Sequence, residues 1–198
     1  MLNIFLIRHG QTEWNKQEKM QGSKNSELTS YGLNQANLLH NHFQNIKINR
    51  VYTSPIDRAM ITAKTIFPNH DIKIANELRE ISMGYWEGRN YSDIENEYPQ
   101  QWYNFFNDPF KYIPTLNGES FSELEYRIKK FLKNEDIQEL SGNIAIVSHK
   151  LTIKMMLSVL LNDKNVFTET DISPSSVSKI TFNNNAFVVE YVNHEERH

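Results

Sequence analysis

The apolar run Met1-Leu-Asn-Ile-Phe-Leu-Ile7 passes directly into Arg8-His9-Gly10 at the start of this 198-residue chain. A short run so rich in strand-forming residues predicts a buried β-strand. The strand ends in a cation, a titratable nucleophile and a residue with a permissive backbone. Buried strands deliver reactive side chains to the edge of a sheet in this way, so the sequence predicts a site at Arg8 and His9.

A second buried strand is predicted over residues 143–148, and it also ends in a histidine, His149. If the two strands are parallel and adjacent, His9 and His149 lie at the same edge of one sheet. Arg58 lies in the first turn of a predicted helix that follows a short strand at 50–53, so we expect it at this edge too. Two arginines, two imidazoles and helix N–H groups suit a dianionic phosphoryl group.

Helical periodicity separates the predicted strands. Thr29 is expected to cap a helix, and Ser54-Pro55 are expected to be the N-cap and first residue of the next. Ser120-Phe-Ser-Glu123 forms a capping-box pattern ahead of a third helix. The other predictions are a buried face of Leu33, Ala36, Leu39 and Phe43, extended chain within residues 72–82, a buried helix over 151–161 and a hairpin of 177–182 with 187–191.

Strands that alternate with helices predict an α/β fold, namely a three-layer α/β/α arrangement around a mostly parallel sheet. We expect residues 1–198 to form a single domain. Residues 85–118 hold a concentration of aromatic side chains interrupted by prolines, and we expect a small helical insertion over the carboxyl edge of the sheet. Most of these rings should pack its own core, with Tyr85, Trp86 or Tyr103 the best candidates to face a substrate.

Composition narrows the range of partners. The formal net charge is −3, so nothing attracts the chain as a whole to nucleic acid or to acidic membranes. There are no cysteines, which excludes disulfides and thiolate metal sites. No apolar run is long enough to cross a bilayer, and the amino terminus lacks the pattern of a signal peptide. We therefore expect a cytoplasmic protein without nucleic-acid or membrane partners, with a homodimer left open.

Several separated blocks resemble the histidine phosphatases of the phosphoglycerate mutase-like superfamily, in particular its short phosphatase members. The blocks follow the family's order over about the first three quarters of the chain, and such ordered agreement is far more specific than any single motif. They are Leu6-Ile-Arg-His-Gly-Gln-Thr-Glu-Trp-Asn15, Gln21-Gly22, Leu28-Thr-Ser-Tyr-Gly-Leu-Asn-Gln-Ala36, Tyr52-Thr-Ser-Pro-Ile-Asp-Arg-Ala59, Thr62-Ala63, Leu78-Arg-Glu-Ile-Ser-Met-Gly-Tyr-Trp-Glu-Gly88, Gly118-Glu-Ser120 and Ile144-Ala-Ile-Val-Ser-His149.

The resemblance implies a role for each matching residue. His9 would be the nucleophile that becomes phosphohistidine, and Glu80 would be the general acid. Neither a metal nor another cofactor is implied. The residues expected to hold the phosphoryl oxygens are Arg8, Arg58 and His149, with Asn15, Gln21 and Gly22 at the same edge and Lys150 at the rim. Lys150-Leu151 departs from the family, which often has two small residues after the second histidine.

The chemistry sets requirements that a structure can test. His9 can attack only through a neutral ring nitrogen, so we expect a backbone acceptor near Gly10 to fix its tautomer. A protonated His149 would stabilise the transferring phosphoryl group. Glu80 would have to begin protonated, which requires partial burial, while Glu77 and Glu87 are nearby alternatives.

Three functions fit these residues. The first is a metal-independent phosphatase that hydrolyses small phosphomonoesters through phosphohistidine on His9. The second is a cofactor-dependent phosphoglycerate mutase, which needs the same pocket, although such enzymes tend to be longer. The third is a phosphate-ligand binding protein without turnover, and no residue of the chain supports it directly.

Overall fold

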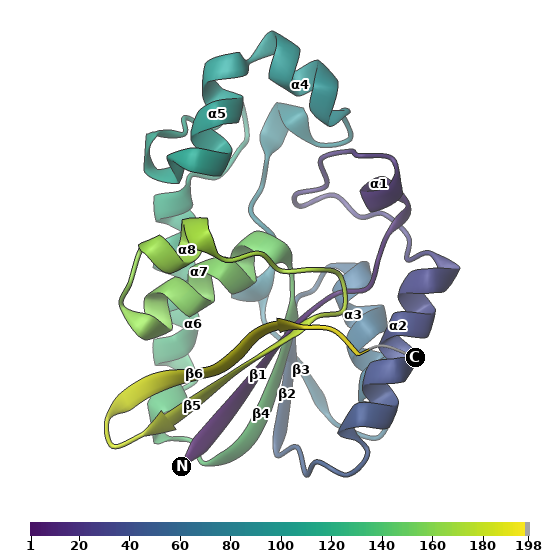
Figure 1. Cartoon of the computed structure of the whole chain (residues 1–198), viewed down its shortest axis with the longest axis vertical. Coiled ribbons are helices and arrows are strands. Elements are labelled where there is room, and N and C mark those ends of the chain that lie inside the picture. Colours follow the sequence, from purple (N-terminus) through teal and green to yellow (C-terminus); the bar gives the residue numbers. More distant parts are fainter. Residues whose placement is uncertain (197–198) are drawn as a thin grey trace.

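Strand β1 (Leu2–Arg8) lies inside a six-stranded sheet in the computed structural model, which describes residues 1–196 (Figure 1). The strand order is β3-β2-β4-β1-β5-β6. The first four are parallel, and β5 and β6 form an antiparallel hairpin beside β1. The mostly parallel α/β sheet predicted from the sequence is therefore confirmed. The other strands are β2 (Arg50–Thr53), β3 (Ile72–Ile74), β4 (Gly142–Ser148), β5 (Val177–Asn183) and β6 (Ala186–His194).

Helices cover both faces of the sheet, α2 and α3 on one side and α6 and α7 on the other (Figure 1). The alternation of β1 produces the two layers, because Leu2, Ile4 and Leu6 pack into one hydrophobic cluster while Phe5 and Ile7 pack into the other. The helices are α1 (Glu13–Lys16), α2 (Ser30–Phe43), α3 (Asp57–Ile66), α4 (Tyr91–Glu97), α5 (Pro99–Asn107), α6 (Phe121–Asn134), α7 (Lys150–Leu161) and α8 (Asn165–Glu169), with 3₁₀ turns η1 (Asn76–Leu78), η2 (Gly84–Trp86), η3 (Pro109–Lys111) and η4 (Ile137–Glu139).

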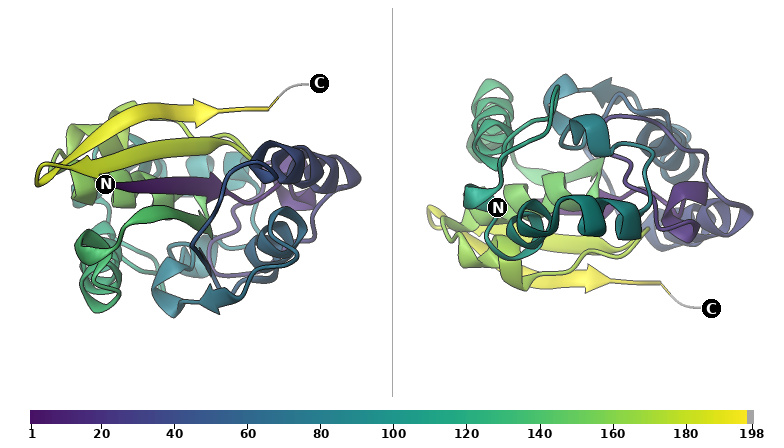
Figure 2. Two further views of the ribbon diagram at one scale, coloured as in Figure 1. Left: turned by 90° about the horizontal axis from the view of Figure 1, so that it is seen from below. Right: turned by 90° about the horizontal axis from the view of Figure 1, so that it is seen from above.

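The aromatic insertion lies over the end of the sheet at which β1 and β4 finish (Figures 1 and 2). Helices α4 and α5 and turn η3 build it, as the prolines and aromatic side chains predicted. Trp86 is fully buried at its centre. The rings of Tyr98, Trp102, Phe105 and Tyr112 surround Trp86, with centroid distances between 5.3 and 6.2 Å. The insertion therefore has its own small aromatic core.

The capping patterns in the sequence predicted the start of two helices correctly and the start of a third incorrectly. Thr29 caps α2, and Ser120 forms the expected capping box with Glu123 at the start of α6. Helix α3, however, begins at Asp57 rather than at Ser54-Pro55, and Ile56 is its N-cap residue. Ser54 is instead fully buried, with its hydroxyl 2.8 Å from the ring of His149. The same hydroxyl accepts from the N–H of Ile56 at 3.2 Å, so Ser54 combines a local turn contact with the contact to His149.

Other local predictions were wrong for reasons of packing. Leu33 is exposed, because Gly32 takes its place on the buried face of α2, where the α2 backbone approaches Gly10 and Gln11. A Cβ on Gly10 would lie 2.5 Å from the carbonyl oxygen of Gly32, so the close approach requires glycine. The segment predicted to be extended within residues 72–82 contains strand β3, turn η1 and then extended chain at Arg79. The short helix α8 was not predicted.

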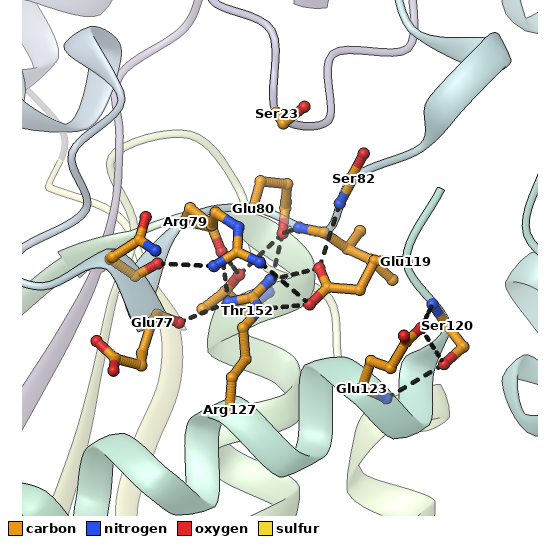
Figure 3. A network of polar contacts seen from close by, with 12 residues as sticks. Ser23, Glu77, Arg79, Glu80, Ser82, Glu119, Ser120, Glu123, Arg127 and Thr152 are labelled. Atoms are coloured by element: carbon orange, nitrogen blue, oxygen red, sulfur yellow. Dashed lines mark hydrogen bonds and ion pairs between the residues drawn. The ribbon is translucent and has the colours of Figure 1, made fainter. Parts of the chain in front are cut away.

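A buried ion pair holds the segment between η1 and η2 against helix α6 (Figure 3). Arg127 of α6 donates to both carboxylate oxygens of Glu119, at 2.6 and 2.9 Å. Its remaining amino group donates to the carbonyl oxygens of Glu77 and Arg79, at 2.5 and 2.8 Å. The Glu119 carboxylate also accepts from the N–H of Ser82 at 3.3 Å, and the main-chain N–H of Glu119 donates to the carbonyl oxygen of Ser82 at 2.7 Å. The pair therefore clamps both ends of the 79–82 segment.

We predict that Arg127→Ala lowers the free energy of unfolding by about 3 kcal/mol, because it leaves the buried Glu119 carboxylate with only its longer ion pair to Arg79, at 3.7 Å. Adding Glu119→Ala should recover part of this loss, since the double variant buries no lone charge. Urea denaturation of the two single variants and the double variant measures the coupling. Lys129→Ala, which removes an exposed i,i+4 pair on the same helix, is the control and should cost at most about 0.5 kcal/mol. Strictly additive losses would contradict the clamp.

Candidate active site

A cavity of about 210 Å³ is lined by residues that follow the ends of β1 and β4 and by residues of the insertion. It brings together most of the residues that the sequence singled out. Those that line it are Arg8, His9, Asn15, Gln21, Gly22, Arg58, Glu80 and Lys150. The others are Met20, Met83, Tyr91, Phe105, Phe106, Leu151, Lys154 and Phe167. Four cationic side chains and a single carboxyl group therefore face this space, against a wall that is largely apolar.

The pairing of β1 with β4 places the two histidines together. The strands are parallel, and Arg8 lies opposite Ser148 in the register. His9 and His149 follow directly, with ring centroids 5.2 Å apart. His149 is fully buried and lies behind His9 rather than in the wall of the cavity.

Hydrogen bonds fix the tautomer of His9. Its Nδ1 lies 2.7 Å from the carbonyl oxygen of Gly10, which only an N–H can satisfy, so Nδ1 carries the proton. The lone pair is then on Nε2, which accepts from Nε of Arg58 at 3.3 Å. This is the backbone acceptor at Gly10 that the sequence predicted.

Burial and nearby cations keep both imidazoles neutral. Desolvation, followed by the positive charges of Arg58 and Arg8, holds the pKa of His9 well below 6.5. Desolvation, Arg58 and His9 likewise hold the pKa of His149 well below 6.5. In the free protein a protonated His149 would be a buried cation beside Arg58, so His149 is neutral there. Its protonation with a phosphoryl group bound stays a prediction.

The two arginines are buried and are held by main-chain carbonyl groups. Arg58 donates to the carbonyl oxygens of Lys24 and Gly22, at 2.6 and 2.7 Å, and burial lowers its pKa to about 10. Gly22 adopts a φ of +57°, and a Cβ there would lie 2.3 Å from a carboxylate oxygen of Glu87. Arg8 donates to the carbonyl oxygen of Ile172 at 2.6 Å, while its Nε is buried without a partner among the described residues. Neither guanidinium forms an ion pair within residues 1–196.

Glu80 is docked on the first turn of α7. Its carboxylate oxygens accept from the N–H groups of Leu151 and Thr152, each at 3.1 Å. They also accept from the Thr152 hydroxyl at 3.0 Å and from the N–H of Ile81 at 3.1 Å. Glu80 is 6% exposed, so the predicted burial is present. These four donors fix the position of the carboxyl group, and its protonated starting state stays a prediction.

The remaining predicted residues lie at the rim. The hydroxyl oxygen of Thr12 lies 3.0 Å from the side-chain carbonyl oxygens of both Asn15 and Gln21, and its single proton is donated to one of them at a time. Lys150 pairs with Asp171 at 2.5 Å. Glu87, one of the alternative carboxyl groups, does not line the cavity. Its carboxylate accepts from the N–H groups of Ser23 and Met83 and so holds those two loop segments together.

Sequence reasoning missed part of the wall. Tyr85 and Tyr103 are exposed and Trp86 is core, so none of the three rings expected at the substrate lines the cavity. The aromatic side chains that line it are Tyr91, Phe105, Phe106 and Phe167. Lys154 was also missed, although it lies four residues after Lys150 and so on the same face of α7.

Nowhere in residues 1–196 do three or more His, Asp or Glu side chains gather closely enough to hold a metal ion. No helix in the same range is long and apolar enough to cross a membrane.

Comparison with known proteins identifies the family. Residues 4–195 match the model of the histidine phosphatase superfamily (branch 1). The adenosylcobalamin/alpha-ribazole phosphatase of Salmonella typhimurium is 31% identical over 81% of this chain and 80% of that protein. A probable phosphoglycerate mutase of Yersinia enterocolitica is 32% identical over 81% and 75%.

A solved structure agrees in fold as well. The phosphoserine phosphatase of Entamoeba histolytica, in complex with 3-phosphoglyceric acid, superposes with a TM-score of 0.86 at 27% identity, covering 99% of this chain and 98% of that one. The chain therefore belongs to branch 1 of the histidine phosphatase superfamily and is a phosphomonoesterase of the histidine phosphatase type.

Proposed function

We propose that this protein hydrolyses small phosphomonoesters through a phosphohistidine intermediate on His9, without a metal ion. The observation that carries the proposal is the tautomer of His9. Its Nδ1 proton is donated to Gly10, so Nε2 holds its lone pair at the wall of the cavity between two arginines. A neutral, oriented imidazole nitrogen beside buried cations is suited to attack a bound phosphorus atom.

The phosphoryl group would bind at the arginine end of the cavity. Its oxygens replace His9 Nε2 as the acceptor for Arg58 and supply the partner that Arg8 Nε lacks. Charge spread over those oxygens in the transition state is stabilised by guanidinium groups that burial has already desolvated. A bound dianion also favours protonation of His149. Further contacts are proposed for Asn15, Gln21, Gly22 and Lys150.

Glu80 would supply the proton to the leaving alkoxide. This role requires Glu80 to carry a proton when the substrate is bound. After transfer to the leaving oxygen, the carboxylate activates the water that hydrolyses phosphohistidine. Residues 1–198 would form one domain for this chemistry, with the insertion at about 85–118 limiting entry of solvent.

Relatives provide the substrate candidates for an assay. The similar phosphoserine phosphatase was crystallised with 3-phosphoglyceric acid, and another relative is described as a probable phosphoglycerate mutase. A panel that includes 3-phosphoglycerate therefore separates hydrolysis, which releases phosphate, from mutase activity, which gives 2-phosphoglycerate when a bisphosphorylated primer is present.

We predict that His9→Ala abolishes phosphate release from every ester of the panel, because no other group can accept the phosphoryl group. Rapid acid-free quenching with a ³²P-labelled ester should show an acid-labile phosphoenzyme in the wild type and none in the variant. EDTA should leave the wild-type rate unchanged. Loss of activity in EDTA that added metal restores, or a labelled His9→Ala protein, would overturn the mechanism.

Glu80→Gln should reduce the first-turnover rate with an alkyl phosphate by roughly 10²–10⁴-fold, because an amide cannot donate the proton. With p-nitrophenyl phosphate the loss should be much smaller, since p-nitrophenolate leaves without a proton. Burst kinetics with both esters tests the difference. Glu77→Gln, which changes a half-buried carboxyl group on the same segment, is the matched control and should resemble the wild type. Equal losses with both esters would contradict the assignment.

The ionisation of His9 gives a pH prediction. Since its pKa lies well below 6.5, His9 stays neutral as the pH falls through 6.5, whereas an ordinary histidine gains a proton there. The ¹⁵N chemical shift of the His9 ring should therefore show no titration between pH 8 and about 6, with free histidine as the reference. A midpoint near 6.5 would mean that Arg58 and burial do not control this group.

A further inference from the structure

Lys154 lies in the cavity one helical turn beyond Lys150. Residues four apart in an α-helix share a face, and both lysines line the cavity with Leu151 between them. The N–H groups that hold Glu80 belong to Leu151 and Thr152. Lys154 thus lies in the same cavity as Glu80, two residues beyond the N–H groups that hold the carboxylate.

Lys154 has no carboxylate partner within residues 1–196. Lys150 is neutralised by Asp171, at 2.5 Å, whereas the Lys154 ammonium lies over the ring of Phe167, with its centroid 5.1 Å away. A cation over an aromatic face is stabilised only weakly. The ammonium is therefore a half-buried charge that an anion entering the cavity could pair with.

The charge and the size of the cavity limit what that anion can be. A phosphate dianion would pair with Arg8 and Arg58, and Lys150 already forms an ion pair with Asp171. Within the part of the chain that the structure describes, Lys154 is then the one positive charge of the cavity wall that has no negative partner. The volume, about 210 Å³, is below the usual range of about 300–1,000 Å³ for sites that hold drug-sized ligands. The space favours a short molecule over one with a bulky aromatic base.

We propose that Lys154 forms a second anion subsite, and that the preferred substrates are short phosphomonoesters whose alcohol portion carries a carboxylate. This inference rests on the proposed function for the position of the phosphate. The carboxylate pairs with the Lys154 ammonium, while the short carbon chain contacts Phe167 and Phe106. Lys154 is a specificity residue and takes no part in the chemical step.

The test compares two esters that differ at one carbon. 3-Phosphoglycerate carries a carboxylate where glycerol 3-phosphate carries a hydroxymethyl group. The wild type should prefer 3-phosphoglycerate in kcat/KM, and Lys154→Met should reduce this preference by about 10- to 100-fold, the range for a charge-assisted hydrogen bond. The loss should appear in KM for 3-phosphoglycerate, with the KM for glycerol 3-phosphate and both kcat values unchanged.

Two further variants make the result specific. Lys164→Met removes another lysine that lies over an aromatic ring, that of Phe110 at 4.5 Å, and Lys164 does not line the cavity. It should keep the wild-type preference. Lys154→Arg retains the positive charge and should restore most of the preference. A preference unchanged in Lys154→Met, or lost equally in Lys164→Met, would overturn the subsite.

Binding separates this inference from catalysis. In a His9→Ala background, calorimetry should show that Lys154→Met weakens 3-phosphoglycerate binding by the same 10- to 100-fold and leaves glycerol 3-phosphate binding unchanged. Equal effects on the two ligands overturn the subsite even if the enzyme hydrolyses both. A selective effect supports the subsite even if the wild type releases no phosphate, and in that case only the proposed function fails.

The pH dependence provides an independent readout. Desolvation and the charge of Lys150 lower the pKa of Lys154 to about 8, while Asp171 and Glu80 oppose the shift. Because the ammonium loses its proton as the pH rises above this value, the preference for 3-phosphoglycerate should fall between pH 7.5 and 9.5. The fall should vanish in both Lys154→Met and Lys154→Arg. A fall of the same size in Lys154→Met would assign it to another group.

Discussion

The parallel pairing of β1 with β4 is the constraint on which the site depends. The register sets Arg8 opposite Ser148, so the residue that follows each strand is a histidine at the same edge of the sheet. A slip of one residue would turn His9 to the opposite face and separate the rings, which now lie 5.2 Å apart. The apolar alternation of β1, which fills a core on each side of the sheet, enforces this register.

The same edge concentrates positive charge that the protein does not neutralise with carboxylates. Arg8 and Arg58 are buried, and main-chain carbonyl groups orient them without cancelling their charge. Burial and these positive charges lower the pKa of both histidines, which are therefore neutral. Charges that are already desolvated and fixed require little reorganisation when a phosphoryl group arrives, which is the physical basis of electrostatic preorganisation.

The carboxyl group of the site is positioned by contacts far from the strand ends. Arg127 and Glu119 hold the main chain on both sides of Glu80, and the first turn of α7 holds its carboxylate (Figure 3). Helix α7 thereby has two roles, since its N–H groups bind Glu80 and its next turn presents Lys154 to the cavity. The insertion adds the aromatic side chains of Tyr91, Phe105 and Phe106 to the wall of the cavity.

The sequence alone determined the mostly parallel α/β sheet, the aromatic insertion and the residues that gather at the strand ends, because hydrophobic period, caps and ordered motifs are local signals. It could not determine the neutral His149, the docked carboxylate of Glu80 or the contact between Ser54 and His149. Nor could it identify Phe106, Phe167 and Lys154 as cavity residues in place of Tyr85, Trp86 and Tyr103. Protonation states and cavity walls depend on burial and on partners distant in the chain, and only the tertiary structure brings those together.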